Sequence, residues 1–296
     1  MLRRLYWHLY GIFYCTLTRI SPRLNTIMRY RSKFKCFPNL NNPESFNEKL
    51  LKIKLENYNK NPLVNQCADK YAVRAYVENR GLGKILIPLL GHYLNPYDIN
   101  WDSLPNRFVI KWNFGCHLNI ICKDKQLLDK CEVTKKLEMW KSEKFHLEHS
   151  ELQYKIPNNR KCIIIEPFLD NGKGECPEDY KLYCYDGKPM YILLCSNRRA
   201  NGRADYYYFD FDWNFYPFDI ENKIPPKNSE MLKPKCLDEM YHYASILSKG
   251  FPFVRVDFYE INQTVYFGEL TFTPCACMDQ AITHEANMIL GKPIQI

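Results

Sequence analysis

The sequence has no C-x-x-C pair, no internal repeat and no low-complexity tract. Its thirteen cysteines are an odd number, and the closest two, Cys275 and Cys277, are too near each other in the chain for ordinary metal-ligand spacing. This pattern disfavours both a disulfide framework and a zinc site. We therefore expect reduced cysteines, as in a cytosolic protein.

A stretch typical of a secretory leader or a membrane span is also missing. The opening MLRRLYWHLYGIFYCTLTRISPR has the charge order of a signal peptide, but its apolar part contains His8 and several tyrosines, and no small-residue cleavage site follows. The stretch is also too short and too polar to cross a bilayer. We expect a cytoplasmic protein that is not exported.

Arginines nevertheless accompany aromatic residues near the N-terminus: Arg3, Arg4, Arg19, Arg23 and Arg29. Such a basic helix could lie on an anionic membrane surface, which would place the protein at the inner face of the membrane. It could equally pack on the main body of the protein. The sequence leaves both interpretations open.

The chain does have what a folded core requires. It has 296 residues, 46% of them hydrophobic, with 17 phenylalanines and 22 tyrosines, which suits one large domain or a few interlocked lobes. The formal net charge is +8, which we interpret as a modest excess spread along the chain. This excess favours an anionic partner such as phosphate, a uronic-acid polymer or a lipid surface. Nucleic acid is not expected, because no recognised module or dense basic helix appears.

Local patterns predict helices and strands without the regular alternation of a doubly wound sheet, which indicates the α+β class. Ser45 and Glu48 form a capping box that starts one helix, and another helix is expected over 69–81, with Lys70 and Arg74 on one face. Further helices are expected at 126–143, 229–249 and 279–290. The apolar stripe of the helix at 229–249 consists of Leu237, Met240, Tyr241, Ala244 and Leu247. Strands are expected at 108–111, 118–122, 162–170 and 206–218, with hairpins around Asp186-Gly187 and over 254–272.

The hairpin over 254–272, VRVDFYEINQTVYFGELTF, has the clearest pattern. With a turn at 262–264, so that Ile261 pairs with Val265, one face collects only residues suited to burial: Val254, Val256, Phe258, Gly268, Leu270 and Phe272. The other face then contains three opposed pairs: Arg255 with Thr271, Asp257 with Glu269, and Tyr259 with Phe267. A slip of one residue would mix the two sets, so the pattern predicts this register.

Like charges directly opposite each other destabilise a hairpin, so the pair of Asp257 and Glu269 needs an explanation. Adjacent carboxylates usually share a proton or bind a cation, and magnesium prefers a few carboxylate oxygens together with phosphates. Arg255 on the same face could meet a phosphate. The plainer alternative is a solvated face on which Arg255 and surface lysines offset the acids. The pattern alone leaves both explanations open.

Short motifs in the expected order resemble those of ATP-grasp enzymes. RVDF at 255–258 and GELT at 268–271 resemble the metal-binding end, preceded by DK at 69–70, VIK at 109–111 and IEPF at 165–168. Seven segments resemble the TupA-like branch, named for teichuronopeptide synthesis: PESFNEKL, CADKYAVR, NIICKDK, DYKLYCYDGKP, DFDWN, FPFVRVDFY and FGELTFTP. The resemblance, from about residue 40 to 291, implies an ATP-grasp fold with two α+β lobes gripping ATP and an N-terminal basic helical extension.

The resemblance also implies a role for particular residues. It assigns contacts with ATP to Lys70, Lys111, Asn113, Gly115, Asn119, Glu166, Phe168, Asp179 and Lys181. Among these, Lys70 and Lys111 would contact phosphates, the loop 113–119 would close over them with backbone amides, Glu166 would meet the adenine, and Asp179 the ribose. The implied magnesium ligands are Asp257, Glu269 and Thr271. Arg255 and Arg198 would face the transferring phosphate.

Three features depart from the expected ATP-grasp pattern. The phosphate loop is usually N-H-G-S-G-x-N, whereas residues 113–119 read NFGCHLN, with one glycine fewer and cysteine in place of serine. Thr271 stands where many ATP-grasp enzymes have an asparagine ligand, although the TupA-like branch commonly has threonine. Cys277 stands where the family often has glycine. Slow ATP turnover or a degenerate nucleotide binder would be compatible with these changes.

The resemblance implies an ATP- and Mg²⁺-dependent carboxylate–amine ligase of bacterial capsule or cell-surface polysaccharide biosynthesis. The expected substrates are a uronic-acid sugar or other anionic polysaccharide precursor and an amine. Asp210-Phe211-Asp212 offers a D-x-D motif for the alternative, a glycosyltransferase or sugar kinase of the same pathway. A nucleotide-binding scaffold without catalysis is a third possibility. We expect four consecutive segments: a helical extension at 1–40, a pre-grasp region at 41–105, a lid subdomain at 106–170 and a C-terminal subdomain with the metal site at 171–296.

Overall fold

The structure is a computed structural model that describes residues 2–199, 203–221, 223–225 and 233–296. The chain forms two compact units, each assembled from separate segments. Unit 1 comprises Met1–Leu40, Leu51–Val73 and Pro88–Phe168, and unit 2 comprises Asn41–Leu50, Arg74–Ile87 and Leu169–Ile296. The division into four consecutive segments stays a prediction.

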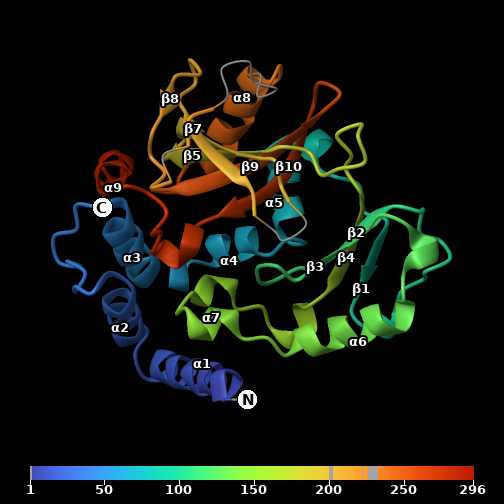
Figure 1. The fold of residues 1–296 in the computed structure, drawn as a ribbon, viewed down its shortest axis with the longest axis horizontal. Coiled ribbons are helices and arrows are strands. Elements are labelled where there is room, and N and C mark those ends of the chain that lie inside the picture. Colours follow the sequence, from blue (N-terminus) through green and yellow to red (C-terminus); the bar gives the residue numbers. More distant parts are fainter. Residues whose placement is uncertain (1, 200–202, 222, 226–232) are drawn as a thin grey trace. The chain divides into compact units, whose positions relative to one another are not determined.

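Unit 1 combines helices with a four-stranded antiparallel sheet (Figure 1). Its helices are α1 Leu2–Ile20, α2 Pro22–Phe34, α4 Pro62–Ala68, α6 Lys130–Lys141 and α7 Phe145–Glu148. Its strands, in sheet order, are β1 Gly91–Tyr93, β4 Ile163–Pro167, β2 Phe108–Trp112 and β3 Asn119–Cys122. The predicted strand, turn and strand around Gly115 and the predicted buried strand at 162–170 are therefore confirmed. The predicted polar helix at 126–143 is shorter, because a 3-10 turn at Lys125–Leu127 precedes α6.

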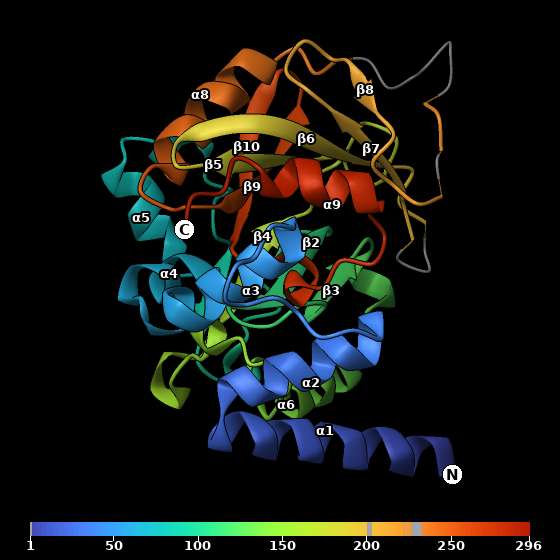
Figure 2. The ribbon, with the colours of Figure 1, turned by 90° about the vertical axis from the view of Figure 1, so that its left-hand side faces the viewer.

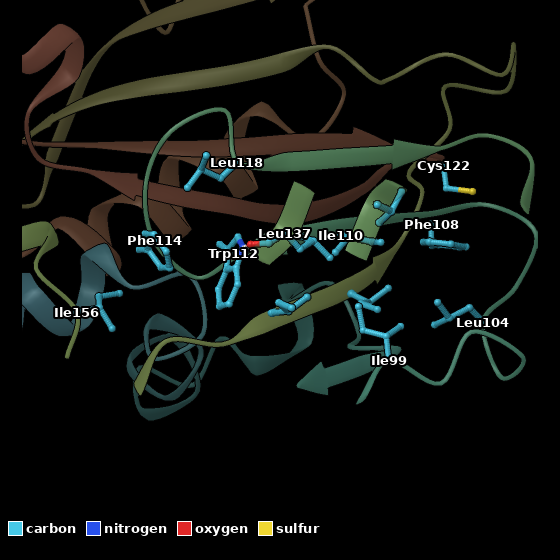
Figure 3. Packing of buried hydrophobic residues seen from close by; sticks show 13 residues of the cluster. Ile99, Leu104, Phe108, Ile110, Trp112, Phe114, Leu118, Cys122, Leu137 and Ile156 are labelled. Atoms are coloured by element: carbon cyan, nitrogen blue, oxygen red, sulfur yellow. Dashed lines mark hydrogen bonds between the residues drawn. The ribbon is translucent and has the colours of Figure 1, made fainter. Parts of the chain in front are cut away.

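Side chains of β2 alternate between buried and partly exposed, and the buried ones belong to the core of unit 1 (Figure 3). Phe108, Ile110 and Trp112 are fully buried and pack with Leu137 of α6. The Trp112 indole N–H donates a hydrogen bond of 3.0 Å to the Leu137 carbonyl, which satisfies the polar atom of this large side chain. This core holds the end of β2 and the loop that follows it.

The helix predicted over 69–81 begins later than expected. Asp69 caps a turn, because its Oδ1 accepts the backbone amides of Tyr71 and Ala72 at 2.9 and 3.1 Å. The helix α5 spans Val73–Asn79. Lys70 thus precedes the helix, and its amide donates to the Asn113 carbonyl at 2.9 Å. The prediction that Lys70 and Arg74 share a helix face is wrong, because Asp69 prefers to cap the turn.

Unit 2 contains a six-stranded antiparallel sheet with helices on both faces (Figure 2). The strands, in sheet order, are β10 Thr264–Thr271, β9 Val254–Ile261, β5 Asp179–Tyr185, β6 Lys188–Ser196, β7 Asp205–Phe209 and β8 Phe215–Tyr216. Helix α8, Leu237–Ser248, packs against β5, β6 and β9. On the other face Tyr185 donates to the Leu290 carbonyl of α9, His284–Gly291, at 3.0 Å. The first turn of α3, Phe46–Glu56, lies on that face too, since Phe46 packs on Tyr183.

The predicted capping box and hairpin turn are both found in unit 2. Ser45 Oγ accepts the Glu48 amide at 3.4 Å and donates to its carboxylate at 2.9 Å. Asp186 and Gly187 connect β5 to β6, with φ of 45° and 81°, as a tight two-residue hairpin requires.

The helix predicted at 229–249 begins at Leu237, and residues 233–236 are not helical. Residues 229–232 lie outside the described part of the chain. Tyr243 occupies the buried stripe, whereas Tyr241, predicted there, is 41% exposed. The prediction that Tyr241 is buried is therefore wrong: a tyrosine two positions further on faces the sheet instead.

The hairpin β9–β10 differs from the predicted register between its turn and Gly268. The turn contains only Asn262 and Gln263, so Ile261 pairs with Thr264, not with Val265. The predicted pairs near the turn are wrong, and Phe267 is buried beside Phe258. A bulge then inserts one extra residue, Gly268, which shifts the register back.

Beyond the bulge the predicted register holds. Asp257 lies opposite Glu269, and Arg255 opposite Thr271. These two predicted pairs are confirmed because the short turn and the bulge compensate for each other. Gly268 suits the bulge, since a Cβ there would lie 3.0 Å from the Asp257 carbonyl oxygen.

Two general expectations can also be compared with the structure. The described residues include every cysteine of the chain, and none of these cysteines forms a disulfide bond in the structure. Among the helices in the described residues, none combines the length and apolarity that crossing a membrane requires.

Candidate functional site

One face of the unit 2 sheet, opposite the face that α8 covers, concentrates charged side chains. The register places Lys181 of β5 beside Asp257 of β9, and Asp257 beside Glu269 of β10. Because alternate residues of a strand point to the same face, three neighbouring strands contribute to one group. We name this group the charged face; its members are Asp179, Lys181, Arg198, Arg255, Asp257, Glu269 and Thr271.

Asp257 lies at the centre of the charged face and is only 2% exposed. Arg255 binds it with two hydrogen bonds of 2.7 Å, and Lys181 Nζ lies 2.9 Å from its Oδ2. Burial alone would raise the pKa of Asp257, but Arg255 and Lys181 outweigh burial and hold this pKa below its usual value. Asp257 is therefore an ionised carboxylate at neutral pH.

Glu269 is the most accessible acid of the charged face, with a side chain that is 43% exposed. Its Oε1 accepts a hydrogen bond of 3.1 Å from the Thr271 hydroxyl, and the same hydroxyl accepts one of 3.1 Å from Arg255. The Arg255 guanidinium also lies 3.6 Å from Glu269. Arg255 thus contacts both opposed acids, so their proximity does not by itself require a metal ion.

The negative charges of Asp257 and Glu269 are compensated in a way that neither explanation from the sequence fully predicted. Arg255 does offset them, as the plainer alternative predicts. The lysine involved, however, is Lys181, whose side chain is 13% exposed and not a surface group. Asp257, Lys181 and Arg255 therefore form a largely buried ion network, whereas Glu269 at its edge stays accessible to solvent.

The carboxylate oxygens of the charged face can be compared with the ligands that Mg²⁺ prefers. A carboxylate has about four acceptor sites, and Asp257 uses three of them for Arg255 and Lys181. Asp257 and Glu269 keep free acceptor capacity of the type that Mg²⁺ prefers. No group of three or more His, Cys, Asp or Glu side chains suited to a metal occurs among the described residues. Two carboxylates do not complete a metal site by themselves, so the residues fit Mg²⁺ only together with a second anionic ligand, such as a polyphosphate, that supplies the remaining oxygens.

Asp179 is buried at one end of the charged face. Its Oδ2 accepts hydrogen bonds from Lys181 at 2.5 Å and from Arg198 at 3.2 Å. Its Oδ1 is also buried, yet finds no hydrogen-bond partner within the described chain. Burial raises the pKa of Asp179, although Lys181 opposes this effect. A buried acceptor without a partner is costly, so Asp179 is suited to receive a ligand hydroxyl.

Two further residues of this region were missed by the sequence interpretation. Tyr259 pairs with Asp179 across β5 and β9, and the Asp179 charge together with burial raises the pKa of Tyr259 well above its usual value. Cys195 accepts a hydrogen bond from Arg198 at 3.1 Å. The alternation of β9 already placed Tyr259 on the same face as Asp257 and could have identified it. No sequence signal identified Cys195.

Unit 1 contains a second group of predicted nucleotide contacts. Lys111 of β2 and Glu166 of β4 form an ion pair of 2.5 Å, with side chains that are 24% and 10% exposed. Glu166 is thus a buried carboxylate that a lysine compensates. Next to this strand end, the Arg107 guanidinium lies 4.5 Å from the ring centroid of Phe168, which holds this buried ring in a cation–π contact.

The predicted phosphate loop, residues 113–119, connects β2 to β3. Lys70 Nζ donates to the Gly115 carbonyl at 2.8 Å, so this lysine binds the loop itself. Asn119 is exposed at the start of β3. Gly115 and His117 both have positive φ, of 73° and 61°. His117 occupies the position where the family motif has its second glycine, so the glycine-like backbone persists without the glycine.

Asn113 has a structural role in the loop. Its side chain donates to Asp69 and to the Arg160 carbonyl at 2.9 and 3.0 Å and accepts the Cys162 amide at 2.9 Å. Its own backbone groups bond with Cys162 and Lys70. Asn113 is fully buried, and this leaves it no group to offer a nucleotide. We therefore revise its predicted role from ATP contact to support of the loop.

Solved structures with a similar fold include D-alanine–D-alanine ligase from Bacillus anthracis, at 17% identity over 85% of this chain and 69% of that chain, with a TM-score of 0.42. The same enzyme complexed with ATP has 16% identity, coverage of 77% and 63%, and a TM-score of 0.44. L-amino acid ligase from Bacillus licheniformis has 14% identity, coverage of 82% and 53%, and a TM-score of 0.45. This chain thus spans about half to two-thirds of the length of these proteins. No curated protein sequence matches it.

A family model of ATP-grasp proteins covers most of the chain. Its description is TupA-like ATPgrasp, and it matches residues 48–295. The chain belongs to the TupA-like ATP-grasp family. The predicted α+β class and ATP-grasp fold are thereby confirmed.

Proposed function

We propose that this protein is an ATP- and Mg²⁺-dependent carboxylate–amine ligase that amidates a uronic-acid sugar in bacterial capsule or cell-surface polysaccharide biosynthesis. A carboxylate oxygen of the sugar attacks the γ-phosphorus of ATP, and ADP leaves. An amine then attacks the acyl phosphate carbon, phosphate departs, and the amine loses a proton as the amide forms. The proposed place of action is the cytoplasm, with the basic first helix at the inner face of the membrane.

The observation that carries this proposal is the charged face. Asp257 and Glu269 retain acceptor capacity for Mg²⁺, with Thr271 between Arg255 and Glu269. Arg255 and Arg198 would neutralise charge that develops on the transferring phosphate. Positioning and charge neutralisation are the main requirements of phosphoryl transfer, and this face offers groups for both.

The remaining contacts with ATP are proposed for each unit separately. Lys111 would contact phosphates and Glu166 the adenine, while Lys70 would act on the phosphate loop through its bond to Gly115. Gly115 and Asn119 would supply backbone amides, and Phe168 would border the adenine. In unit 2, the unpartnered Asp179 oxygen would accept a ribose hydroxyl beside Lys181.

The geometry around the D-x-D motif supports the ligase over the glycosyltransferase alternative. Asp210 Oδ1 accepts the backbone amides of Asp212 and Asn214 at 3.0 and 2.9 Å. Its Oδ2 lies 3.4 Å from the Tyr216 hydroxyl. Asp210 thus closes the turn between β7 and β8, which accounts for it without a metal ion or a nucleotide sugar.

The test is an activity screen with purified protein, ATP and Mg²⁺ against uronic-acid sugars and amines, in which ADP release and the amide product are measured. We expect Asp257→Asn and Glu269→Gln to abolish turnover while the fold is retained. Glu260→Gln on the same strand as Asp257 is the matched control and should keep full activity. UDP release from a nucleotide sugar would support the transferase alternative instead, and full activity in either site variant would refute the site.

A further inference from the structure

The positive charge of the protein is not spread along the chain as the composition alone suggested. Residues 1–35 contain eight arginines and lysines and no aspartate or glutamate, and the net charge of the whole chain is also +8. All other residues together are therefore formally neutral. The whole formal excess lies in the segment that forms α1 and α2, so long-range attraction to an extended anionic surface acts mainly there.

One face of α1 is anchored within unit 1. Thr18 donates to the Leu147 carbonyl of α7 at 2.5 Å, and Tyr14 and Thr18 are only 5% and 3% exposed. Asn25 of α2 donates to the Tyr14 carbonyl and to the Thr18 hydroxyl at 2.8 and 2.6 Å. Arg29 stacks 4.8 Å from the Tyr14 ring centroid. These bonds fix the orientation of α1 about its own axis.

The opposite face of α1 carries an apolar stripe in solvent. Leu9, Ile12, Phe13 and Ile20 are 56%, 51%, 52% and 75% exposed. Their spacing places them on one side of the helix, roughly opposite Tyr14 and Thr18. We name these four residues the α1 stripe. On the following helix Leu24 and Met28, one turn apart, are also 43% and 37% exposed.

Basic side chains border this apolar surface. Arg19 precedes Ile20, Arg23 precedes Leu24, and both arginines are exposed. A helix with exposed apolar residues on one side, basic residues at its edge and no acidic residue has the composition of an interfacial helix. Phosphate headgroups would pair with the arginines while the apolar side chains enter the acyl boundary.

We propose that the α1 stripe, flanked by Arg19 and Arg23, docks this protein on an anionic lipid surface. A second copy of the chain fits less well, because two surfaces with this excess of positive charge repel each other. An anionic polysaccharide would satisfy the arginines but would give Phe13 and Ile12 no apolar environment. The inference specifies the membrane contact of the proposed function, and its test does not depend on ligase chemistry.

The experiment is co-sedimentation of the full chain with vesicles of phosphatidylcholine that contain phosphatidylglycerol, compared with phosphatidylcholine alone. We expect binding only to the anionic vesicles, and weaker binding at higher salt. The double variants Ile12→Asp/Phe13→Asp and Arg19→Glu/Arg23→Glu should each lower the binding constant about tenfold or more. The control Lys60→Glu/Lys135→Glu makes the same charge change at exposed positions away from α1 and should bind nearly as the unaltered protein does.

Three results would overturn the proposal: no binding to anionic vesicles, equal binding to neutral vesicles, or an equal loss in the control. A dimer that Ile12→Asp/Phe13→Asp converts to a monomer would instead show that the stripe joins two copies. Circular dichroism should confirm that all variants fold, since the altered residues are exposed. ADP release without vesicles should be unchanged in the stripe variants, which separates this test from that of the ligase proposal.

Discussion

His117 and Cys277 each occupy a position where the family resemblance places glycine, and both have a φ of 61°. A residue with a Cβ pays roughly 1–2 kcal/mol in this conformation, which glycine does not. The sequence showed the missing glycines, but it could not show whether the backbone had changed with them. The structure shows that both residues adopt the left-handed conformation that favours glycine.

Replacing His117 with glycine should therefore relieve strain in the phosphate loop. We expect His117→Gly to stabilise the protein slightly, by about 0.5 kcal/mol, because the lost strain exceeds the added flexibility of the unfolded chain. Urea unfolding monitored by fluorescence measures the change. Asn119→Gly is the control in the same segment: it starts a strand without positive φ and should destabilise by roughly 0.5–1 kcal/mol. Equal destabilisation in both variants would contradict the claim that the backbone of His117 is strained.

Lys111 is the residue of unit 1 whose proposed contact with ATP can be tested most simply. We expect Lys111→Ala to weaken ATP binding about tenfold or more, because a charge-assisted hydrogen bond contributes roughly 1.5–3 kcal/mol. Calorimetric titration with ATP measures the affinity, and Lys135→Ala on exposed α6 is the control. Unchanged affinity in Lys111→Ala would remove this lysine from the phosphate site and leave it as the structural partner of Glu166.

At the scale of elements, the hairpin β9–β10 shows how opposed residues can be predicted correctly although the position of the turn is predicted wrongly. Alternation of apolar residues correctly predicted that Asp257 faces Glu269. It could not locate the turn, because Asn262 and Gln263 adopt positive φ of 51° and 59° without the glycine that usually signals such a turn. It also could not distinguish Gly268 in a regular strand from Gly268 in a bulge.

The bulge should be essential to the charged face. Gly268→Ala introduces a Cβ 3.0 Å from the Asp257 carbonyl oxygen, so we expect a destabilisation of about 1–2 kcal/mol and loss of Mg²⁺-dependent ADP release. Urea unfolding and the ADP assay together measure both effects. Gly11→Ala in α1 is the control, since a Cβ there meets no atom within 4 Å. That variant should gain roughly 0.5–1 kcal/mol from helix propensity. Normal activity in Gly268→Ala would contradict the role of the bulge.

Helix α7 contributes a dependence of stability on pH. Burial, assisted by the charges of Arg29, Lys54 and Lys33, lowers the pKa of His149, which follows α7, to about 3. The unfolded chain has a higher histidine pKa, so it binds a proton first as the pH falls. This contribution to stability is complete above about pH 6.5 and is lost progressively as the pH falls towards 3.

We therefore expect the melting temperature to fall between pH 7 and pH 5, and to fall less in His149→Gln. Differential scanning calorimetry at the two pH values measures the difference. His242→Gln, at an exposed position of α8, is the control and should show the same fall as the unaltered protein. An identical fall in His149→Gln would show that another group causes the acid sensitivity.

At the scale of the whole molecule, the α+β class followed from the sequence, but the assembly of the units did not. Asn47 is 1% exposed, and its side chain donates to the Asp279 carbonyl and accepts the Asp279 amide at 3.0 and 3.1 Å. Its amide donates to Asn287 at 3.0 Å. Bonds across more than 200 residues leave no local pattern in the sequence. Consecutive segments were therefore the only division that local patterns could suggest.

The ion pairs within the charged face determine how well this face can bind Mg²⁺. Arg255 and Lys181 already compensate Asp257, so Mg²⁺ alone gains little from these acids. ATP brings phosphate charge and oxygens, which attract both the cations and the metal. Binding of ATP and of Mg²⁺ should therefore depend on each other.

The most direct test is calorimetric titration of ATP into the protein with Mg²⁺ and with a chelator in its place. We predict that Mg²⁺ tightens ATP binding about tenfold or more, and that Asp257→Asn and Glu269→Gln remove this gain, because they remove carboxylate ligands. Glu260→Gln should retain it. An equal gain from Mg²⁺ in both site variants and in the unaltered protein would contradict the claim that Asp257 and Glu269 hold the metal with ATP.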